Sequence, residues 1–418
     1  MSLPALETAL QPVSDHQRET ADPLDKGVAA IVLFVVGSAL VAGRTSPIPY
    51  LWIAIASIIV LSYATIVSKS ETVRALCLNL AVACLVLGAA ESYFWAKEPL
   101  ERRMDYSDGF FLSDDVLGYA PAPDRSIRHR AYADDQPLYD VTYHLDSRGL
   151  RRAMPVNADQ DRTKPCLAFF GDSFTFGEGM PDERTMPYQV GEKVGPGYRV
   201  VNFGFLGYGP HQMLAALEAG QLQSRGQCRP NHILYQAIPT HVSRAAGLES
   251  WDQHGPNYVL DSAGGVRRAG RFDDRRPITA PEWLRLLHRN LYTQVRAALE
   301  ASALYRTVLR SHRLIEQEDI ARFTAIVETA KHSATHAFPA TGFSVLFWDY
   351  DDDTVVGRAV QDQLRARGLA IYPMSTILPG FPAERARYEI SPYDRHPNAQ
   401  AHALIADYVA HHIVSASR

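Results

Sequence analysis

The chain has 418 residues, of which 21% are charged and 46% are hydrophobic, and its formal net charge is −4. This length allows one large domain with additional segments, or two ordinary domains. The mixed charge, without a Lys/Arg-rich run or a CxxC pair, argues against nucleic acid as a partner. The apolar residues are unevenly spread, because residues 27–96 are overwhelmingly apolar and the rest resembles a soluble protein.

Three apolar segments lie near the start of the chain, at 27–43, 48–67 and 73–96. A membrane-spanning helix needs about 20 largely apolar residues. We therefore predict a polar tail at 1–26 and a membrane anchor of three transmembrane helices within 27–96, where Asn79 and Glu91 would support helix association. A cleaved signal peptide does not fit, because the first 26 residues are polar and further apolar segments follow.

The orientation of this anchor does not follow from its charges. Three spans place the two ends of the chain on opposite faces of the membrane. The flanking basic residues divide equally between these faces, with Arg18, Lys26, Lys69 and Arg74 against Arg44, Lys97, Arg102 and Arg103. The positive-inside rule therefore does not decide the topology.

The remainder of the chain has two parts with different patterns. Residues 97–158 include an alternating stretch, YDVTYHL, and are expected to form a β-rich lead-in. From 159 to 418 strand and helix patterns alternate, which predicts an α/β domain with a parallel sheet covered on both faces. An insertion at about 245–340 contains a predicted hairpin around Gly264 and Gly265 and one or two amphipathic helices. It could be a lid that shapes a substrate site or a structural cover, and both interpretations stay open.

Two cysteines of the soluble part stand just before apolar runs. Cys166 precedes LAFF and Cys228 comes shortly before HILYQAI. If these runs are neighbouring parallel strands, the cysteines could meet at the amino-terminal ends and form a disulfide, as in an oxidising compartment. Two unpaired buried cysteines are the alternative.

A serine and a histidine–aspartate pair stand at positions where catalytic groups are expected. Ser173 follows an apolar strand in LAFFGDSFTFG, and Asp394 and His396 follow the last predicted strand in DRHPN. Ligands of open α/β sheets bind at the carboxyl ends of the strands. A serine nucleophile needs a base and a third group that orients the base. The pattern therefore predicts a Ser–His–Asp site at this edge of the sheet.

The blocks GDSFTFGEG, NFGFLGYG and DRHPN, in this order, resemble the SGNH hydrolases, also called the GDSL esterase/lipase family. The resemblance covers residue 165 to the end, apart from the insertion. It implies a flavodoxin-like three-layer α/β/α fold without a cofactor, with Ser173 as nucleophile, His396 as base and Asp394 as its orienting group. It also implies an oxyanion hole built from the backbone N–H groups of Ser173 and Gly204.

Two features depart from the family pattern. The Asp–His spacing is D-x-H where D-x-x-H is common, although the shorter form resembles many bacterial members. The third block lacks its usual asparagine donor, and alignment by strand puts Thr240 there, followed by His241. We favour His241 as the replacement donor because of its reach, with a purely structural role as the alternative. His211, His254 and His402 are expected at the surface or in supporting positions.

Together these features predict a membrane-anchored serine esterase that acts on O-acyl esters, O-acetyl esters first among them, of cell-envelope or exopolysaccharide glycans. The alternatives are an O-acyltransferase with the same triad and a catalytically silent glycan-binding scaffold. The expected partners are an acylated glycan, the lipid bilayer and envelope polysaccharide machinery. No metal-binding spacing is present. The expected location is the bacterial inner membrane, with the catalytic domain on the periplasmic side.

Overall fold

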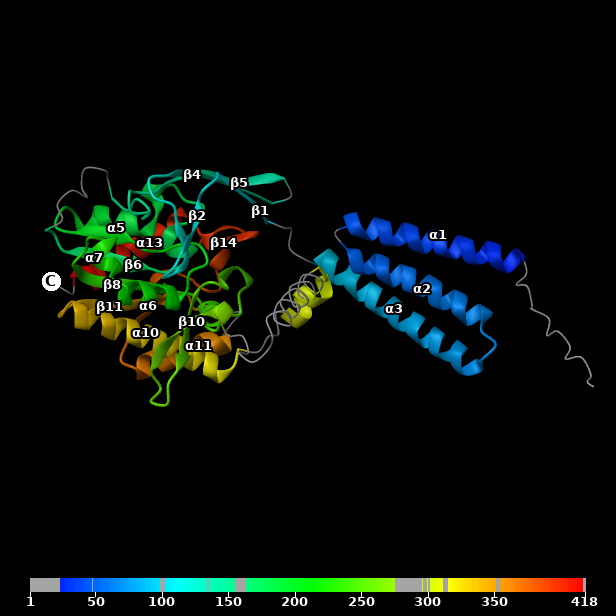
Figure 1. Ribbon diagram of the computed structural model, residues 1–418. Helices are drawn as coiled ribbons and strands as arrows, with labels where there is room; N and C mark the ends of the chain where they lie inside the picture. Colours follow the sequence, from blue (N-terminus) through cyan, green and yellow to red (C-terminus); the bar gives the residue numbers. More distant parts are fainter. Residues whose placement is uncertain are drawn as a thin grey trace, which may run out of the picture. The chain divides into compact units, whose positions relative to one another are not determined.

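The structure is a computed structural model that describes residues 23–46, 48–97, 102–133, 135–154, 163–274, 295, 299, 301–310, 315–350 and 354–415 (Figure 1). The chain forms two compact units. One comprises Met1–Glu98 together with Pro281–Arg313, and the other comprises Pro99–Ala280 together with Leu314–Arg418.

The first unit is built on the helices α1 (Pro23–Thr45), α2 (Pro49–Val67) and α3 (Glu71–Lys97). Among the described residues, α2 and α3 are long and apolar enough to cross a membrane, each with a mean hydropathy of 2.1 in its best window. The apolar stretch in α1 is shorter, at Ala30–Ala39, so the third span stays a prediction. α2 and α3 approach closely at Gly88, where a Cβ would lie 3.0 Å from that of Ala54.

The polar side chains of α3 do not join the spanning helices as expected. The Asn79 amide donates to the carbonyl of Ala75 in its own helix. The carboxylate of Glu91, only 3% exposed, accepts from the Ser302 hydroxyl and from the backbone N–H groups of Ala303 and Leu304, at 2.7–3.1 Å. Glu91 thus caps a segment of the insertion, because the first N–H groups of a helix have no partner within it.

The second unit begins with the β-rich segment expected at 97–158. β1 (Arg102–Tyr106), β4 (Ser126–Ala133) and β5 (Gln136–His144) form an antiparallel sheet in the order β1-β4-β5. β2 (Phe111–Asp114) and β3 (Gly118–Pro121) form a hairpin.

The main sheet has five parallel strands in the order β12-β11-β8-β6-β7. Their bounds are β6 (Cys166–Phe170), β7 (Arg199–Asn202), β8 (Pro230–Ala237), β11 (Gly342–Phe347) and β12 (Ala370–Pro373). Counted along the chain, this is the flavodoxin-like order 2-1-3-4-5. The predicted fold class is therefore confirmed.

Helices cover both faces of this sheet, as its strands require. Successive residues of β6 alternate between two cores: Ala168 and Phe170 face one, and Leu167 and Phe169 face the other. The first core is closed by α6 (Pro210–Glu218), α8 (His241–Ala245), α10 (Gln317–Ala337) and α11 (Thr354–Ala366). The second is closed by α5 (Met186–Val194), α12 (Met374–Ile377) and α13 (Ala399–Tyr408). Parallel strands buried on both faces are continuously apolar, which explains the run CLAFF.

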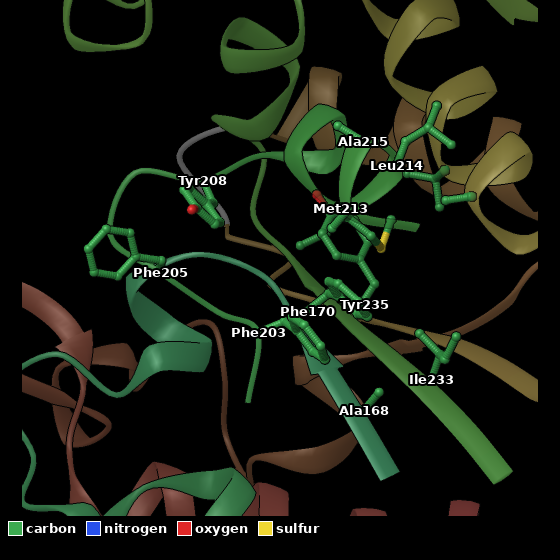
Figure 2. Close-up of a cluster of buried hydrophobic side chains, with 14 of the residues drawn as sticks. Ala168, Phe170, Phe203, Phe205, Tyr208, Met213, Leu214, Ala215, Ile233 and Tyr235 are labelled. Atoms are coloured by element: carbon green, nitrogen blue, oxygen red, sulfur yellow. The ribbon is translucent and has the colours of Figure 1, made fainter. Parts of the chain in front are cut away.

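Figure 2 shows part of the first core. The rings of Phe170 and Phe203 are stacked with centroids 4.8 Å apart, and Tyr235 and Met213 pack in the same cluster. These large side chains fix the carboxyl end of β6 relative to β7 and β8.

The predicted insertion is smaller than 245–340. The expected hairpin is present as β9 (Pro256–Leu260) and β10 (Val266–Arg271). The helix α10, however, contributes Ile320, Phe323 and Ile326 to the core of the main sheet. It is part of the crossover between β8 and β11, so the additional material ends before it. Residues 275–294 lie outside the described part of the chain.

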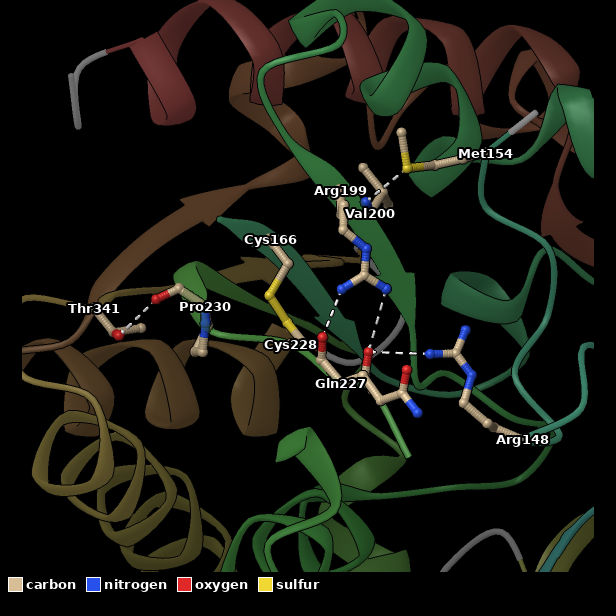
Figure 3. Close-up of a disulfide and its surroundings, with 10 residues drawn as sticks. Arg148, Met154, Cys166, Arg199, Val200, Gln227, Cys228, Pro230 and Thr341 are labelled. Carbon is tan, nitrogen blue, oxygen red and sulfur yellow. Dashed lines mark hydrogen bonds between the residues drawn. A yellow bond between two sulfur atoms is a disulfide. The ribbon is translucent and has the colours of Figure 1, made fainter. Parts of the chain in front are cut away.

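Cys166 and Cys228 form a disulfide, with their Cα atoms 5.7 Å apart (Figure 3). Cys166 opens β6 and Cys228 lies two residues before β8, so the bond joins the amino-terminal ends of neighbouring strands. Next to it, the buried Arg199 guanidinium donates to the carbonyls of Gln227 and Gly226.

Candidate active site

The nucleophile candidate Ser173 begins a short helix directly after β6. The helix α4 (Ser173–Phe176) has Asp172 as its N-cap, whose side chain accepts a hydrogen bond from the Phe174 N–H. Gly171 makes the turn possible: its φ is +150°, and a Cβ there would lie 2.2 Å from the Thr175 hydroxyl oxygen. As the first residue of a helix, Ser173 has an N–H that the helix does not use.

The structure brings Ser173, His396 and Asp394 together. Nε2 of His396 lies 2.8 Å from Oγ of Ser173, and its Nδ1 lies 2.6 Å from Oδ1 of Asp394. The Asp394 side chain is fully buried, whereas that of His396 is 15% exposed. This chain of contacts can pass the serine proton to the imidazole while the carboxylate fixes the tautomer.

His396 and Asp394 lie on a strand, not on the open loop expected from the sequence. β14 (Asp394–Pro397) pairs with β13 (Glu389–Ser391) in an antiparallel ribbon. After it, the Asn398 side chain caps α13 by accepting from the Ala401 N–H at 3.0 Å. The ribbon and the cap hold the base between two ordered elements.

Gly204, the predicted second oxyanion donor, packs against the nucleophile turn. A Cβ at this position would lie 2.7 Å from that of Thr175 and 2.8 Å from the Phe176 nitrogen. Its N–H donates to the Asn202 side chain at 2.9 Å, and the Asn202 amide donates to the Thr175 carbonyl. The Gly204 N–H is therefore engaged, so the prediction that it donates to the oxyanion is wrong in this arrangement. Asn202 ties the second block to the turn that carries Ser173.

The prediction that His241 donates to the oxyanion is wrong in this arrangement. His241 is fully buried, with Nδ1 2.7 Å from the Tyr235 hydroxyl and Nε2 3.1 Å from Oδ2 of Asp172. Both ring nitrogens therefore face other partners. Burial is the largest influence on the pKa of His241 and lowers it to about 4. The Thr240 side chain is exposed at the start of α8.

Asp172 has a role that the sequence analysis missed. Its carboxylate is fully buried and accepts from the Arg244 guanidinium at 2.9 Å. Burial alone would raise the pKa of Asp172, but His241 and Arg244 outweigh that effect and hold it well below its usual value. The residue before Ser173 is therefore a buried carboxylate, held by two side chains of α8, His241 at its first position and Arg244 in its last turn. The block SRA, which contains Arg244, gave no recognisable signal in the sequence.

A buried arginine from the β-rich segment clamps the loop after the nucleophile. The Arg151 side chain is fully buried, and its guanidinium donates to the carbonyls of Phe176, Gly177 and Met180 and to the carboxylate of Asp182, at 2.5–3.1 Å. A single guanidinium has five N–H donors in a rigid plane, which suits it to such a set of acceptors. The segment 97–158 thus takes part in building the site.

The other predicted histidines occupy different environments. His254 is exposed. His211 and His402 are buried, not at the surface: Nε2 of His211 lies 2.7 Å from Asp252, and Nδ1 of His402 accepts from the Met186 N–H. Within the described residues, no group of three or more His, Cys, Asp or Glu side chains could hold a metal ion.

Comparisons with known proteins were made on the sequence and on the fold. No protein-family model matches the sequence, and no curated protein matches it. Similar solved structures include a G-D-S-L family lipolytic protein from Desulfitobacterium hafniense, with 13% identity, 59% of this chain and 98% of that chain covered, and a TM-score of 0.28. A carbohydrate acetylesterase from Sinorhizobium meliloti has 11% identity, coverage of 60% and 100%, and a TM-score of 0.30. An acetyl xylan esterase from Butyrivibrio proteoclasticus has 11% identity, coverage of 60% and 64%, and a TM-score of 0.34.

These identities and TM-scores are low, so the functional conclusion below rests on the geometry of the site. The sheet order is the one that the resemblance to the SGNH hydrolases predicts.

Proposed function

We propose that this protein is a membrane-anchored serine esterase that cleaves O-acyl esters of glycans, with Ser173, His396 and Asp394 as its catalytic triad. The observation that carries the proposal is the unbroken contact from Ser173 Oγ through both nitrogens of His396 to Asp394, at 2.8 and 2.6 Å. These residues come from opposite ends of the α/β domain, so their meeting is not a consequence of local sequence.

The reaction follows from this geometry. Ser173 Oγ bonds to the ester carbonyl carbon as its proton passes to Nε2 of His396, and Asp394 stabilises the imidazolium. The Ser173 N–H, at the start of α4, stabilises the developing oxyanion, and such a donor contributes about 3 kcal/mol. The imidazolium then protonates the departing alcohol oxygen as its bond to the acyl carbon breaks. Water, or an acceptor hydroxyl in an acyltransferase, releases the acyl group by the same steps in reverse.

The position of the enzyme is proposed from the anchor and the disulfide. α2 and α3 can span a bacterial inner membrane, and the Cys166–Cys228 bond is typical of an oxidising compartment. The helices account for anchoring, and the disulfide favours a catalytic unit on the periplasmic side. An acylated envelope glycan is the substrate class that fits this location, with envelope polysaccharide machinery as its source.

The test uses the detergent-solubilised full chain with a fluorophosphonate probe and with p-nitrophenyl acetate. Wild type, Ser173→Ala and His396→Ala are compared after their thermal midpoints have been shown to agree. We expect labelling and turnover in wild type, and a loss of about 10³-fold or more in each variant. Full turnover by Ser173→Ala would refute the proposal.

Silence of all three folded proteins would point instead to an acyltransferase that requires its own donor, or to a glycan-binding scaffold. Acetylated xylan and acetylated envelope glycan, assayed for released acetate and for retained binding, separate these two outcomes.

A further inference from the structure

A second buried carboxylate lies beside the catalytic histidine. Glu178 is 4% exposed, and its Oε2 lies 3.3 Å from Nε2 of His396. The same nitrogen lies 2.8 Å from Ser173 Oγ. The nitrogen that exchanges the reaction's proton therefore faces both the nucleophile and a carboxylate.

The backbone around Glu178 is built to hold it there. Its neighbours Gly177 and Gly179 have φ values of +86° and +79°, which only glycine adopts readily. A Cβ on Gly179 would lie 2.5 Å from Ile390 and 2.9 Å from the Tyr139 ring. The GEG triplet is thus required by the close packing of this loop.

Two contacts from the β-rich segment fix the loop from outside. Arg151 donates to the carbonyl of Gly177, and the Tyr143 hydroxyl accepts from the Gly179 N–H at 2.9 Å. The Tyr139 hydroxyl donates to Glu178 Oε1 at 3.4 Å. Burying a carboxylate costs free energy unless partners compensate for it. A loop that holds the Glu178 carboxylate in a buried position next to His396 therefore indicates a functional role for this residue.

We propose that Glu178 is a positioning residue that acts through His396, by stabilising the imidazolium at Nε2 while Asp394 stabilises it at Nδ1. This inference rests on the proposed function for its role in turnover. Protons balance without a new step: Nε2 takes one proton from Ser173 and returns it to the departing oxygen, and no proton is transferred to Glu178. Two carboxylates make His396 a stronger base than one would.

The described contacts place two carboxylates against His396, those of Glu178 and Asp394. The groups around the pair on the surrounding elements are Tyr139, Tyr143, Arg151 and His402. His129 contacts the hydroxyls of both tyrosines. Burial raises the pKa of Tyr143, so its hydroxyl stays neutral, and burial lowers that of His402 to about 3. Arg151 is the buried cation of this group, and it is paired with Asp182.

The test measures the pKa of His396 directly. The ring of ¹³C-labelled histidine is titrated by NMR in the full chain in detergent, with the signal assigned from a His396→Asn variant. Glu178→Gln is expected to lower the pKa of His396 by about 1–3 pH units, because an opposite charge within a few ångströms shifts a pKa by that amount. The acid limb of kcat/KM for p-nitrophenyl acetate is expected to move in parallel, with a plateau reduced about 10-fold or more.

The controls separate an electrostatic role from a structural one. Glu192→Gln makes the same change at an exposed position on α5, and it is expected to leave both the pKa and the rate unchanged. Glu178→Asp keeps the charge and is expected to give an intermediate pKa. If Glu178→Gln does not fold, the Asp variant decides, and a pKa equal to that of wild type overturns the proposal.

Failure of this inference is distinguishable from failure of the proposed function. An active esterase whose His396 pKa is the same in wild type and Glu178→Gln refutes the role of Glu178 alone. A shifted pKa in a chain without esterase activity refutes the esterase and leaves the contact of Glu178 with the base standing.

Discussion

The Arg244 guanidinium donates to the carboxylate of Asp172 at 2.9 Å, one residue before the nucleophile. Asp172 also caps α4 through the Phe174 N–H. The same carboxylate therefore caps the turn that carries Ser173 and binds α8, the helix that follows β8.

This pair predicts a strong effect of substitution at Arg244. In Arg244→Met the Asp172 carboxylate is left buried without its cation, and breaking a buried pair costs about 3–5 kcal/mol. We expect a lower urea midpoint and loss of esterase activity. The double variant Asp172→Asn/Arg244→Met is expected to regain part of the stability, because it removes the unpaired charge. Arg365→Gln, in a half-exposed pair on α11, serves as control. A midpoint of Arg244→Met equal to that of the control would contradict the role assigned to this pair.

Buried neutral histidines predict that the protein loses stability in acid. Burial lowers the pKa of His402 to about 3 and that of His232 to about 4, whereas the unfolded chain binds a proton near pH 6.5. Below pH 6.5 the unfolded state therefore binds more protons than the folded state, and the free energy of unfolding falls as the pH drops. The expected slope is about 1.4 kcal/mol per pH unit for each histidine.

The measurement is urea unfolding, followed by tryptophan fluorescence, between pH 7 and 4.5. His402→Gln is expected to reduce the slope of the unfolding free energy against pH by about 1.4 kcal/mol per pH unit, the contribution of one proton. His411→Gln, at an exposed site, should leave the slope unchanged. A slope in His402→Gln as steep as in wild type would show that His402 is not neutral in the folded state.

The disulfide predicts a measurable difference between oxidised and reduced protein. It closes a loop with a sequence separation of 62, for which the chain-entropy model gives about 4 kcal/mol. Reduction, or the Cys166→Ser/Cys228→Ser variant, is expected to lower the thermal midpoint. In denatured, unreduced protein isolated from cells, only Cys77 and Cys84 should react with maleimide. Four reactive thiols would argue against an oxidising location.

Gly204→Ala tests the close packing of the second block on the nucleophile turn. The added methyl would lie 2.7 Å from Thr175 Cβ and 2.8 Å from the Phe176 nitrogen, so the turn must shift. Overpacking of this kind costs about 1–3 kcal/mol and is expected to displace Ser173. We expect loss of fluorophosphonate labelling and a modest fall in thermal midpoint. Gly197→Ala, where nothing lies within 4 Å of the added Cβ, should behave as wild type.

The sheet and the meeting of Ser173, His396 and Asp394 follow from the sequence for physical reasons. CLAFF is apolar throughout because β6 is buried on both faces, and the strand–helix alternation predicts the parallel sheet. Ser173, His396 and Asp394 could be predicted because residues at the carboxyl ends of parallel strands share one edge. The same argument placed Cys166 and Cys228 at the opposite edge.

Contacts that depend on side-chain packing could not be predicted in this way. His241 lies at a plausible position along the chain, but its ring is directed to Asp172 and Tyr235, and no local pattern gives that direction. Arg151 stands in an irregular stretch, and its carbonyl acceptors become visible only when the loop after α4 is folded against it. The triplet Gly177-Glu178-Gly179 could have been used to predict the position of Glu178, because two glycines around a carboxylate indicate a constrained backbone.

The clamp by Arg151 has a practical consequence for how the molecule can be divided. A cut shortly before β6 would leave the α/β layers intact, but such a fragment would lose the guanidinium that binds the loop next to Ser173. A fragment that keeps this clamp therefore starts near β1, so the strands of the β-rich segment belong to the same engineering unit as Ser173.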